Sequence, residues 1–120
     1  MSTPFPSARS GSGLIFTSGL AAVDPVTLAP TTDSFDEQAA EVFRQLDSAL
    51  AAAGSSRGLI LKLDCYLADR CWFPAWNSVF RSSFPTAAPA RTTTVTTLPI
   101  DGLLIEIQAI AVAAPQEDRS

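Results

Sequence analysis

The stretch Leu103–Val112 has the alternating pattern of a β-strand that buries one of its two faces. One face is wholly apolar and consists of Leu103, Ile105, Ile107, Ala109 and Ala111. The other face is mixed and consists of Leu104, Glu106, Gln108 and Ile110. Such a strand is stable only in a sheet whose apolar face is covered, so the rest of the chain must provide partner strands and a covering layer.

Two segments have the spacing of helices that can form this layer. Ser34 and Glu37 have the spacing of a capping box, and apolar residues recur at helical intervals from there to Gly54. The segment Asp69–Phe84 predicts a second amphipathic helix, in which Pro74 is tolerable only within the first turn. Its apolar stripe consists of Phe73, Trp76, Val79, Phe80 and Phe84.

Further strands are predicted on both sides of the first helix. Leu14–Gly19, followed by a second short extended piece before Asp24-Pro25, predicts a hairpin. Leu59–Leu67 alternates with the period of a strand that has one buried face, which places Cys65 in the core.

The C-terminal part of the chain predicts a closing hairpin. Arg91–Leu98 is rich in threonine and valine, and a turn at Asp101-Gly102 would join it to the alternating strand. The order ββαβαββ predicts a single α+β domain over residues 1–120, in which a mixed sheet carries both helices on one face. The core is expected over about 4–112, with 113–120 as a flexible tail.

The composition excludes several classes of function. Hydrophobic residues make up 47% of the 120 residues, more than a small domain buries easily, and this surplus favours an oligomer. A net charge of −4 without a basic cluster argues against a nucleic-acid partner, and apolar runs are too short to span a membrane. We therefore expect a cytoplasmic protein.

The content of cysteine and histidine restricts the chemistry further. Cys65 and Cys71 are neither numerous enough for a disulfide scaffold nor spaced as a zinc knuckle, so we expect neither a disulfide nor a metal site. The chain has no histidine, which excludes Ser-His-Asp and Cys-His nucleophiles. Acid-base chemistry must then use carboxylates, water or backbone groups.

Arg91 is the first candidate for a binding residue. It follows Pro89-Ala90 at the start of a predicted strand, where a guanidinium fork would be preorganised for a carboxylate or phosphate. The alternative is an ordinary surface arginine paired with an aspartate or glutamate.

Glu106 is the second candidate, because it interrupts an apolar strand between two isoleucines. A solvated sheet face would explain it, whereas cover by another subunit would raise its pKa and make it a water-activating base. A hairpin between adjacent strands would bring Glu106 near Arg91. Asn77 on the second helix and Ser18-Gly19 at a strand end are weaker candidates for ligand contacts.

Several short motifs, taken in order, resemble those of the Rid family, the reactive-intermediate (enamine/imine) deaminases. The resemblance covers about Pro4 to Val112 and rests on these residues: Phe16-Thr17-Ser18-Gly19, Asp24-Pro25, Gln38, Ala51-Ala52-Ala53-Gly54, Asn77, Pro89-Ala90-Arg91-Thr92 and Ile105-Glu106-Ile107. The family implies a chorismate-mutase-like fold, a homotrimer with clefts between subunits, and no metal or organic cofactor.

The resemblance also implies roles for particular residues. Arg91 would clamp a substrate carboxylate, Ser18 and nearby backbone would seat it, Asn77 would line the cleft, and Glu106 would activate or position water. The implied reaction is hydrolysis of a 2-imino acid, in exchange with its enamine, to a 2-keto acid and ammonia. The alternative is a binding or regulatory module that uses the same clefts for a small carboxylate.

Two residues depart from the best-known deaminase subgroup, which tends to carry tyrosine at position 5 and cysteine at position 93. Phe5 cannot donate a phenolic hydrogen bond, and Thr93 cannot act as a thiol. Both positions are expected to line the substrate cleft, so the two changes would affect substrate identity.

Overall fold

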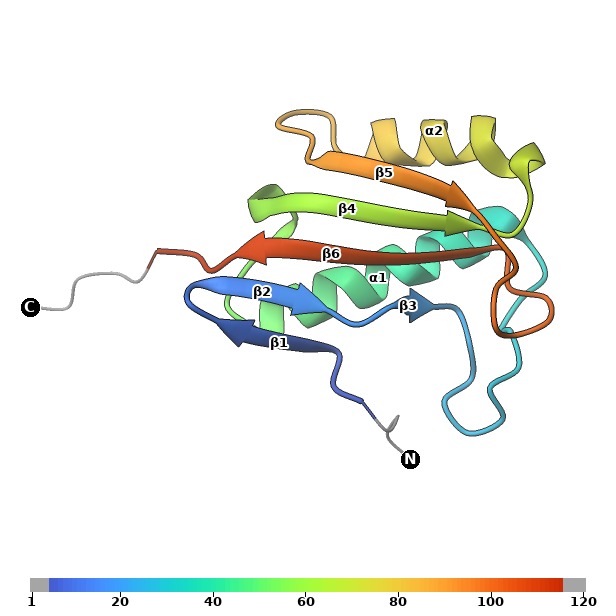
Figure 1. Cartoon of the computed structure of the whole chain (residues 1–120), viewed down its shortest axis with the longest axis horizontal. Helices are drawn as coiled ribbons and strands as arrows, with labels where there is room; N and C mark the ends of the chain where they lie inside the picture. The colour runs from blue at the N-terminus through green and yellow to red at the C-terminus, as the bar shows by residue number, and fades with distance from the viewer. Residues whose placement is uncertain (1–4, 116–120) are drawn as a thin grey trace, which may run out of the picture.

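A computed structural model describes residues 5–115, which form one mixed sheet and two α-helices (Figure 1). The strands are β1 (Ala8–Gly11), β2 (Leu14–Thr17), β3 (Leu20–Ala21), β4 (Ile60–Leu67), β5 (Ala90–Val95) and β6 (Ile105–Val112). The helices are α1 (Phe35–Ala52) and α2 (Phe73–Ser83), with short 3-10 turns at Arg57–Leu59 and Arg70–Trp72. The predicted mixed α+β architecture is confirmed, with one strand more than the sequence indicated.

Strand β6 is the centre of the sheet, whose order is β1-β2-β6-β4-β5. Both β2 and the two-residue β3 pair with β6 along the same edge, antiparallel to it and one after the other. On the other side β6 pairs antiparallel with β4, and β4 pairs parallel with β5. The alternation predicted for β6 is confirmed, because Ile105, Ile107, Ala109 and Ala111 are buried.

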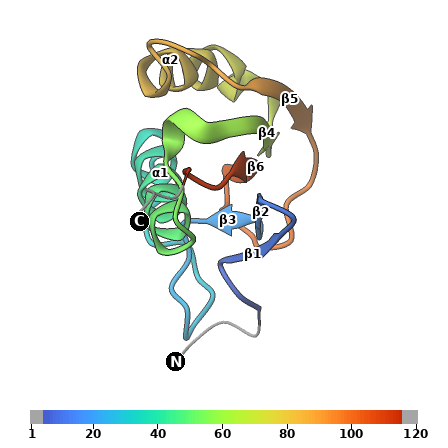
Figure 2. The ribbon, with the colours of Figure 1, turned by 90° about the vertical axis from the view of Figure 1, so that its left-hand side faces the viewer.

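Both helices cover the same face of the sheet (Figure 2). Ser34 caps α1 by accepting a hydrogen bond from the Glu37 backbone N–H, as the sequence predicted. Apolar residues of α1 pack on the apolar faces of β4 and β6 to form the core, which includes Val42, Leu46, Leu50, Leu63, Cys65 and Ile107. The opposite face carries no helix formed by residues 5–115, and we call it the open face. No helix of the described residues has the length and hydropathy of a membrane span.

The N-terminal hairpin differs from the prediction. It consists of β1 and β2, joined by Ser12 and Gly13, which both have positive φ angles of 53° and 78°. Two such residues form the tight turn that suits a two-residue hairpin loop. The extended piece after Gly19 is β3, which pairs with β6 and not with β2, so the hairpin predicted between them is wrong.

The predicted closing hairpin is also wrong, because β4 lies between β5 and β6. After β4, helix α2 carries the chain back so that β5 runs parallel to β4, and the following loop then crosses to the far side of β4. Asp101-Gly102 is a turn within this loop. The buried side chains of Leu98 and Leu103 hold the loop against the domain.

The predicted tail of residues 113–120 lies mostly outside the described residues, as do Met1 to Pro4. The described part of that tail is hydrogen-bonded: the backbone N–H of Ala113 donates to Gly13 and that of Ala114 donates to Gly54. The prediction of flexibility for residues 116–120 therefore stays a prediction.

Candidate functional site

Arg91 lies near the start of β5 and points toward α2 on the helix-bearing face. Its register partner is Leu63, a core residue of β4, which fixes the face on which the side chain lies. One Nη2 N–H donates to Asn77 Oδ1 at 2.6 Å. The guanidinium carbon lies 4.7 Å from the ring centre of Phe80 and 5.9 and 6.0 Å from those of Phe73 and Trp76. Ring faces attract a cation without neutralising it, so they orient the guanidinium and leave its charge available.

Among residues 5–115, Arg91 has no carboxylate partner. None of the ion pairs among residues 5–115 includes it, although its side chain is partly buried. The alternative of an ordinary surface ion pair is therefore not what the structure shows. A partly buried guanidinium whose only hydrogen bond among these residues is to a neutral amide retains donors for an external anion.

Thr93 lies beside Arg91 on the same face of β5. Its register partner is the buried Cys65, and its hydroxyl oxygen accepts a hydrogen bond from Trp76 Nε1 at 3.0 Å. Burial raises the pKa of Cys65 far above its usual range, and the positive charge of Arg91 opposes this only in part. The Cys65 thiol is thus an inert core group. We call Arg91, Asn77, Thr93 and the rings of Phe73, Trp76 and Phe80 the arginine half-site.

Glu106 lies on the open face of β6, at the position where β3 ends. Its neighbours across the two flanking strands are Ala21 on β3 and Tyr66 on β4. A side chain on Gly19 would place its Cβ only 2.5 Å from Glu106 Oε2, so the carboxylate occupies the space that this glycine leaves open. Partial burial raises the pKa of Glu106. A carboxylate that holds its proton more tightly is a stronger base than an exposed one.

Ser18 and Gly19 lie in the break between β2 and β3. At this break the Thr17 hydroxyl accepts a hydrogen bond from the Ala109 backbone N–H at 2.9 Å. This bond takes the place of a backbone hydrogen bond between the strands. The hydroxyl of Ser18 donates to the Pro6 carbonyl at 2.6 Å, and its backbone N–H donates to Ser7. The Ser18 hydroxyl can therefore offer a ligand only its lone pairs. We call Ser18, Gly19 and Glu106 the glutamate half-site.

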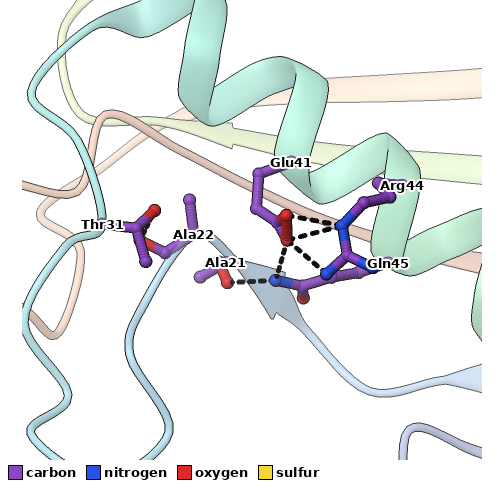
Figure 3. A network of polar contacts seen from close by, with 6 residues as sticks. All are labelled: Ala21, Ala22, Thr31, Glu41, Arg44 and Gln45. Atoms are coloured by element: carbon purple, nitrogen blue, oxygen red, sulfur yellow. Dashed lines mark hydrogen bonds and ion pairs between the residues drawn. The ribbon is translucent and has the colours of Figure 1, made fainter.

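A polar network on α1 fixes the strand that borders this half-site (Figure 3). Gln45 Nε2 donates to the Ala21 carbonyl of β3 at 3.0 Å and also to Glu41. Glu41 is paired with Arg44 at 2.6 Å, and hydrogen bonding by this arginine lowers the pKa of Glu41. Helix α1 thereby holds the backbone next to Glu106.

The two half-sites do not meet within one chain. Arg91 is in register with the core residue Leu63, whereas Glu106 is in register with Tyr66 on the open face. The expectation that adjacent hairpin strands bring Arg91 and Glu106 together is therefore wrong for a single chain, since β4 separates their strands and they lie on opposite faces of the sheet. Phe5 precedes β1, and its side chain is about half exposed, at 50%.

The aromatic setting of Arg91 was missed by sequence reasoning. Phe73, Trp76 and Phe80 have the spacing of a core stripe, and only Trp76 is fully buried, whereas Phe73 is 42% exposed. Asn77 lies between the aromatic residues of this stripe. Its position is the sequence feature that could have connected the stripe with a binding residue. Residues 5–115 contain no cluster of three or more cysteines or carboxylates that could hold a metal ion.

Comparison with known proteins gives a consistent match. A family model described as "Endoribonuclease L-PSP" matches residues 2–113. A chloroplastic protein of Arabidopsis thaliana named Reactive Intermediate Deaminase A is 31% identical over 109 residues, covering 90% of this chain and 58% of that protein. The mitochondrial protein mmf2 of Schizosaccharomyces pombe is 37% identical over 111 residues, covering 90% of this chain and 86% of that protein. This chain thus spans little more than half the length of the Arabidopsis relative.

Solved structures agree with these matches. Yeast Mmf1 superposes with a TM-score of 0.85 at 30% identity, covering 95% of this chain and 90% of that chain. RidA from an Antarctic Psychrobacter species superposes with a TM-score of 0.81 at 28% identity, covering 91% of this chain and 88% of that chain. Both superpositions cover more than nine tenths of this chain, so the predicted fold class is confirmed.

Proposed function

Since this chain belongs to the family described as endoribonuclease L-PSP, which includes the YjgF and Rid proteins, we propose that it is an enamine/imine deaminase. The proposed reaction converts a 2-imino acid and water into a 2-keto acid and ammonia. It calls for no metal or organic cofactor. Both cysteines are free thiols, which agrees with a reducing compartment such as the cytoplasm, our proposed location.

The observation that carries this proposal is the state of Arg91. Its guanidinium is partly buried, held by Asn77 and three aromatic rings, and has no carboxylate partner among the described residues. A protein seldom leaves such a group without an anion, because desolvation of the charge is costly unless a partner compensates it. A substrate carboxylate is an anion that the fork of donors would fit.

We propose that the complete site forms between copies of the chain in a homotrimer. The arginine half-site and the glutamate half-site lie on opposite faces of one sheet, so a single chain cannot apply both to one small substrate. The open face also exposes a large apolar side chain, Phe16, which is 46% exposed and pairs with Ile110 of β6. Contact between copies would cover this face and place Glu106 of one copy opposite Arg91 of another.

The chemistry requires little of the protein. A protonated imine is electrophilic at carbon 2, and Arg91 would hold the adjacent carboxylate so that this carbon faces Glu106. Glu106, as carboxylate, would take a proton from water while the water oxygen bonds to carbon 2. Glu106 would then return this proton to the nitrogen of the carbinolamine, the C–N bond would break, and ammonia would take the hydroxyl proton as it leaves, so that the products are ammonium and the 2-keto acid. The raised pKa of Glu106 suits it to both directions of this proton transfer.

The proposal is tested by following the loss of an imine that is generated in the assay mixture. An amino-acid oxidase converts alanine to 2-iminopropionate, and semicarbazide traps whatever imine survives. We expect the protein to shorten the life of the imine, and Arg91→Ala or Glu106→Gln to abolish the effect. Arg81→Ala and Asp101→Asn remove exposed charges outside both half-sites and should behave like wild type. Equal activity of wild type and Arg91→Ala would contradict deamination of this substrate.

Light scattering tests the assembly separately. A trimer is expected, and a monodisperse monomer would contradict the intersubunit site. Replacement of Phe16 on the open face by glutamate should convert the trimer to smaller species, whereas the same change at exposed Val26, on the loop before α1, should not.

One observation favours a second function, the binding of a small carboxylate without turnover. The Ser18 hydroxyl already donates to Pro6, and Phe5 carries no hydroxyl, so neither side chain offers a proton to a leaving group. Binding of a 2-keto acid that depends on Arg91, in a protein that does not shorten the life of the imine, would establish this function in place of deamination.

A further inference from the structure

The indole of Trp76 determines how the Thr93 hydroxyl can act. Trp76 is fully buried, and its ring packs against Phe43 at 6.2 Å and Phe80 at 5.8 Å between centroids, so its N–H has a fixed direction. That N–H donates to Thr93 Oγ1 at 3.0 Å. The indole has no acceptor atom, so Trp76 is always the donor in this hydrogen bond and Thr93 is always the acceptor.

A threonine hydroxyl has one proton and two lone pairs. Trp76 occupies one lone pair, and the Thr93 hydroxyl donates no hydrogen bond among residues 5–115. Thr93 is partly exposed on β5, which is an edge strand of the sheet. The hydroxyl is therefore left as a donor toward the outside of the domain.

The same indole connects this donor with the anion site. The guanidinium carbon of Arg91 lies 6.0 Å from the Trp76 ring centre, and Arg91 and Thr93 are two positions apart on one face of β5. Alternate residues of a strand are separated by about 6.8 Å, which is the scale of a small carboxylic acid with a substituent on carbon 2. A ligand whose carboxylate binds Arg91 would thus present its carbon 2 toward the Thr93 hydroxyl.

We propose that the Trp76–Thr93 pair makes the arginine half-site selective for carboxylates that carry a hydrogen-bond acceptor on carbon 2. Such an acceptor is the oxygen of a 2-keto acid or the nitrogen of a neutral imine. Thr93 contacts the ligand, and Trp76 is a positioning residue that acts through it. The inference rests on the proposed function only in taking Arg91 as the carboxylate site.

Paired ligands test the selectivity. 2-Oxobutanoate and butanoate differ only in the acceptor on carbon 2, and calorimetric titration of the full chain gives the ratio of their affinities. One neutral hydrogen bond corresponds to roughly a threefold to tenfold preference for the keto acid. Thr93→Val keeps the shape and removes the hydroxyl, so it should lower this ratio by about that factor while butanoate affinity stays the same. Thr93→Ser keeps the hydroxyl and should keep the ratio.

Trp76→Phe tests the positioning role. Without the indole N–H the hydroxyl can turn inward, so the ratio should fall partway toward that of Thr93→Val, whereas a merely structural role would weaken both ligands alike. Thermal melts identify any variant that fails to fold. If Trp76→Phe fails to fold, Thr93→Val and Thr93→Ser still test the proposal.

Three results would overturn the proposal: an unchanged ratio in Thr93→Val, equal loss of both ligands, or no preference in wild type. Failure of the proposed function has a different signature, because binding of butanoate would then be absent or independent of Arg91.

Discussion

The arginine half-site and the glutamate half-site lie on opposite faces of one sheet, and their charged groups are held in different ways. Arg91 is oriented by a hydrogen bond to Asn77 and by three aromatic rings. Glu106 has no side-chain hydrogen bond among residues 5–115, and the main feature of its surroundings is the space that Gly19 leaves for the carboxylate. The arginine half-site thus fixes the direction of the guanidinium, whereas the glutamate half-site leaves the direction of the carboxylate free.

The difference corresponds to what each group can do chemically. A guanidinium stays charged at any ordinary pH, so a protein can improve it as a ligand only by orienting its donors. Rings and a neutral amide provide this orientation without supplying a competing anion. A carboxylate can gain and lose a proton, and desolvation adjusts how tightly Glu106 holds it. The comparison assigns binding to Arg91 and proton transfer to Glu106.

The largest expected effect is that of Glu106→Gln on turnover. The amide cannot take a proton, so we expect hydrolysis of 2-iminopropionate to fall by roughly 100-fold to 10,000-fold, the usual contribution of a general base. Calorimetric affinity for 2-oxobutanoate should stay within about twofold of wild type, because binding belongs to the other half-site. A variant that loses binding together with turnover would break the assignment.

The next effect is that of Arg91→Lys on binding. A lysine retains the charge but not the planar fork, and it cannot reproduce a bidentate carboxylate contact. We expect affinity for 2-oxobutanoate to fall by about 10-fold to 100-fold, which corresponds to the loss of one charge-assisted hydrogen bond. Arg81→Lys is the matched control on α2 and should change nothing. Full affinity in Arg91→Lys would show that charge alone is recognised.

The sequence predicted local structure well where periodicity carries the signal. The face assignment of β6 and the capping of α1 by Ser34 are both confirmed. It failed on strand pairing, because alternation specifies the faces of a strand but not its neighbours. The hairpin turn at Ser12-Gly13 was overlooked in favour of the turn after Gly19, and the loop containing Asp101-Gly102 was mistaken for a hairpin turn.

The site was predictable only in part for a related reason. Arg91 and Glu106 were identified because a charge at a strand start and a charge inside an apolar strand are both local signals. Their separation by β4 depends on pairing, and so does the position of Gly19 against Glu106. The helical spacing predicts Trp76 as a core residue, which it is, but its N–H bond to Thr93 requires α2 and β5 to be side by side.

A smaller effect is expected from Asn77→Asp. The new carboxylate would accept from Arg91 in place of the amide and would supply the anion that the arginine half-site lacks among residues 5–115. It would then compete with a ligand, and we expect affinity for 2-oxobutanoate to fall by about 10-fold. Asn77→Ala removes the acceptor without adding charge and should have a weaker effect in the same assay. The opposite order would mean that Asn77 contacts the ligand more than it orients Arg91.

The smallest effect concerns stability, and it tests the glutamate half-site without any ligand. Because burial raises the pKa of Glu106 above 4.5, the folded protein keeps this proton to higher pH than the unfolded chain does. The stability that the protonated group contributes is full below the unfolded pKa and is lost as pH rises through the folded pKa. Wild type should therefore lose stability relative to Glu106→Gln as pH rises from about 4 to 8 in denaturant titrations.

Asp24 is a control of opposite sign for this measurement. Backbone hydrogen bonds from Thr27 and Val26 lower the pKa of Asp24, so its contribution is present at high pH and is lost as pH falls through the folded pKa. Wild type should thus lose stability relative to Asp24→Asn in acid. If the difference between wild type and Glu106→Gln followed the same direction as Asp24, the carboxylate would be stabilised in its charged form. Such a result would mean that a cation, which in the proposed trimer would be Arg91 of another copy, outweighs the desolvation of Glu106, and it would remove the reason for treating Glu106 as the base.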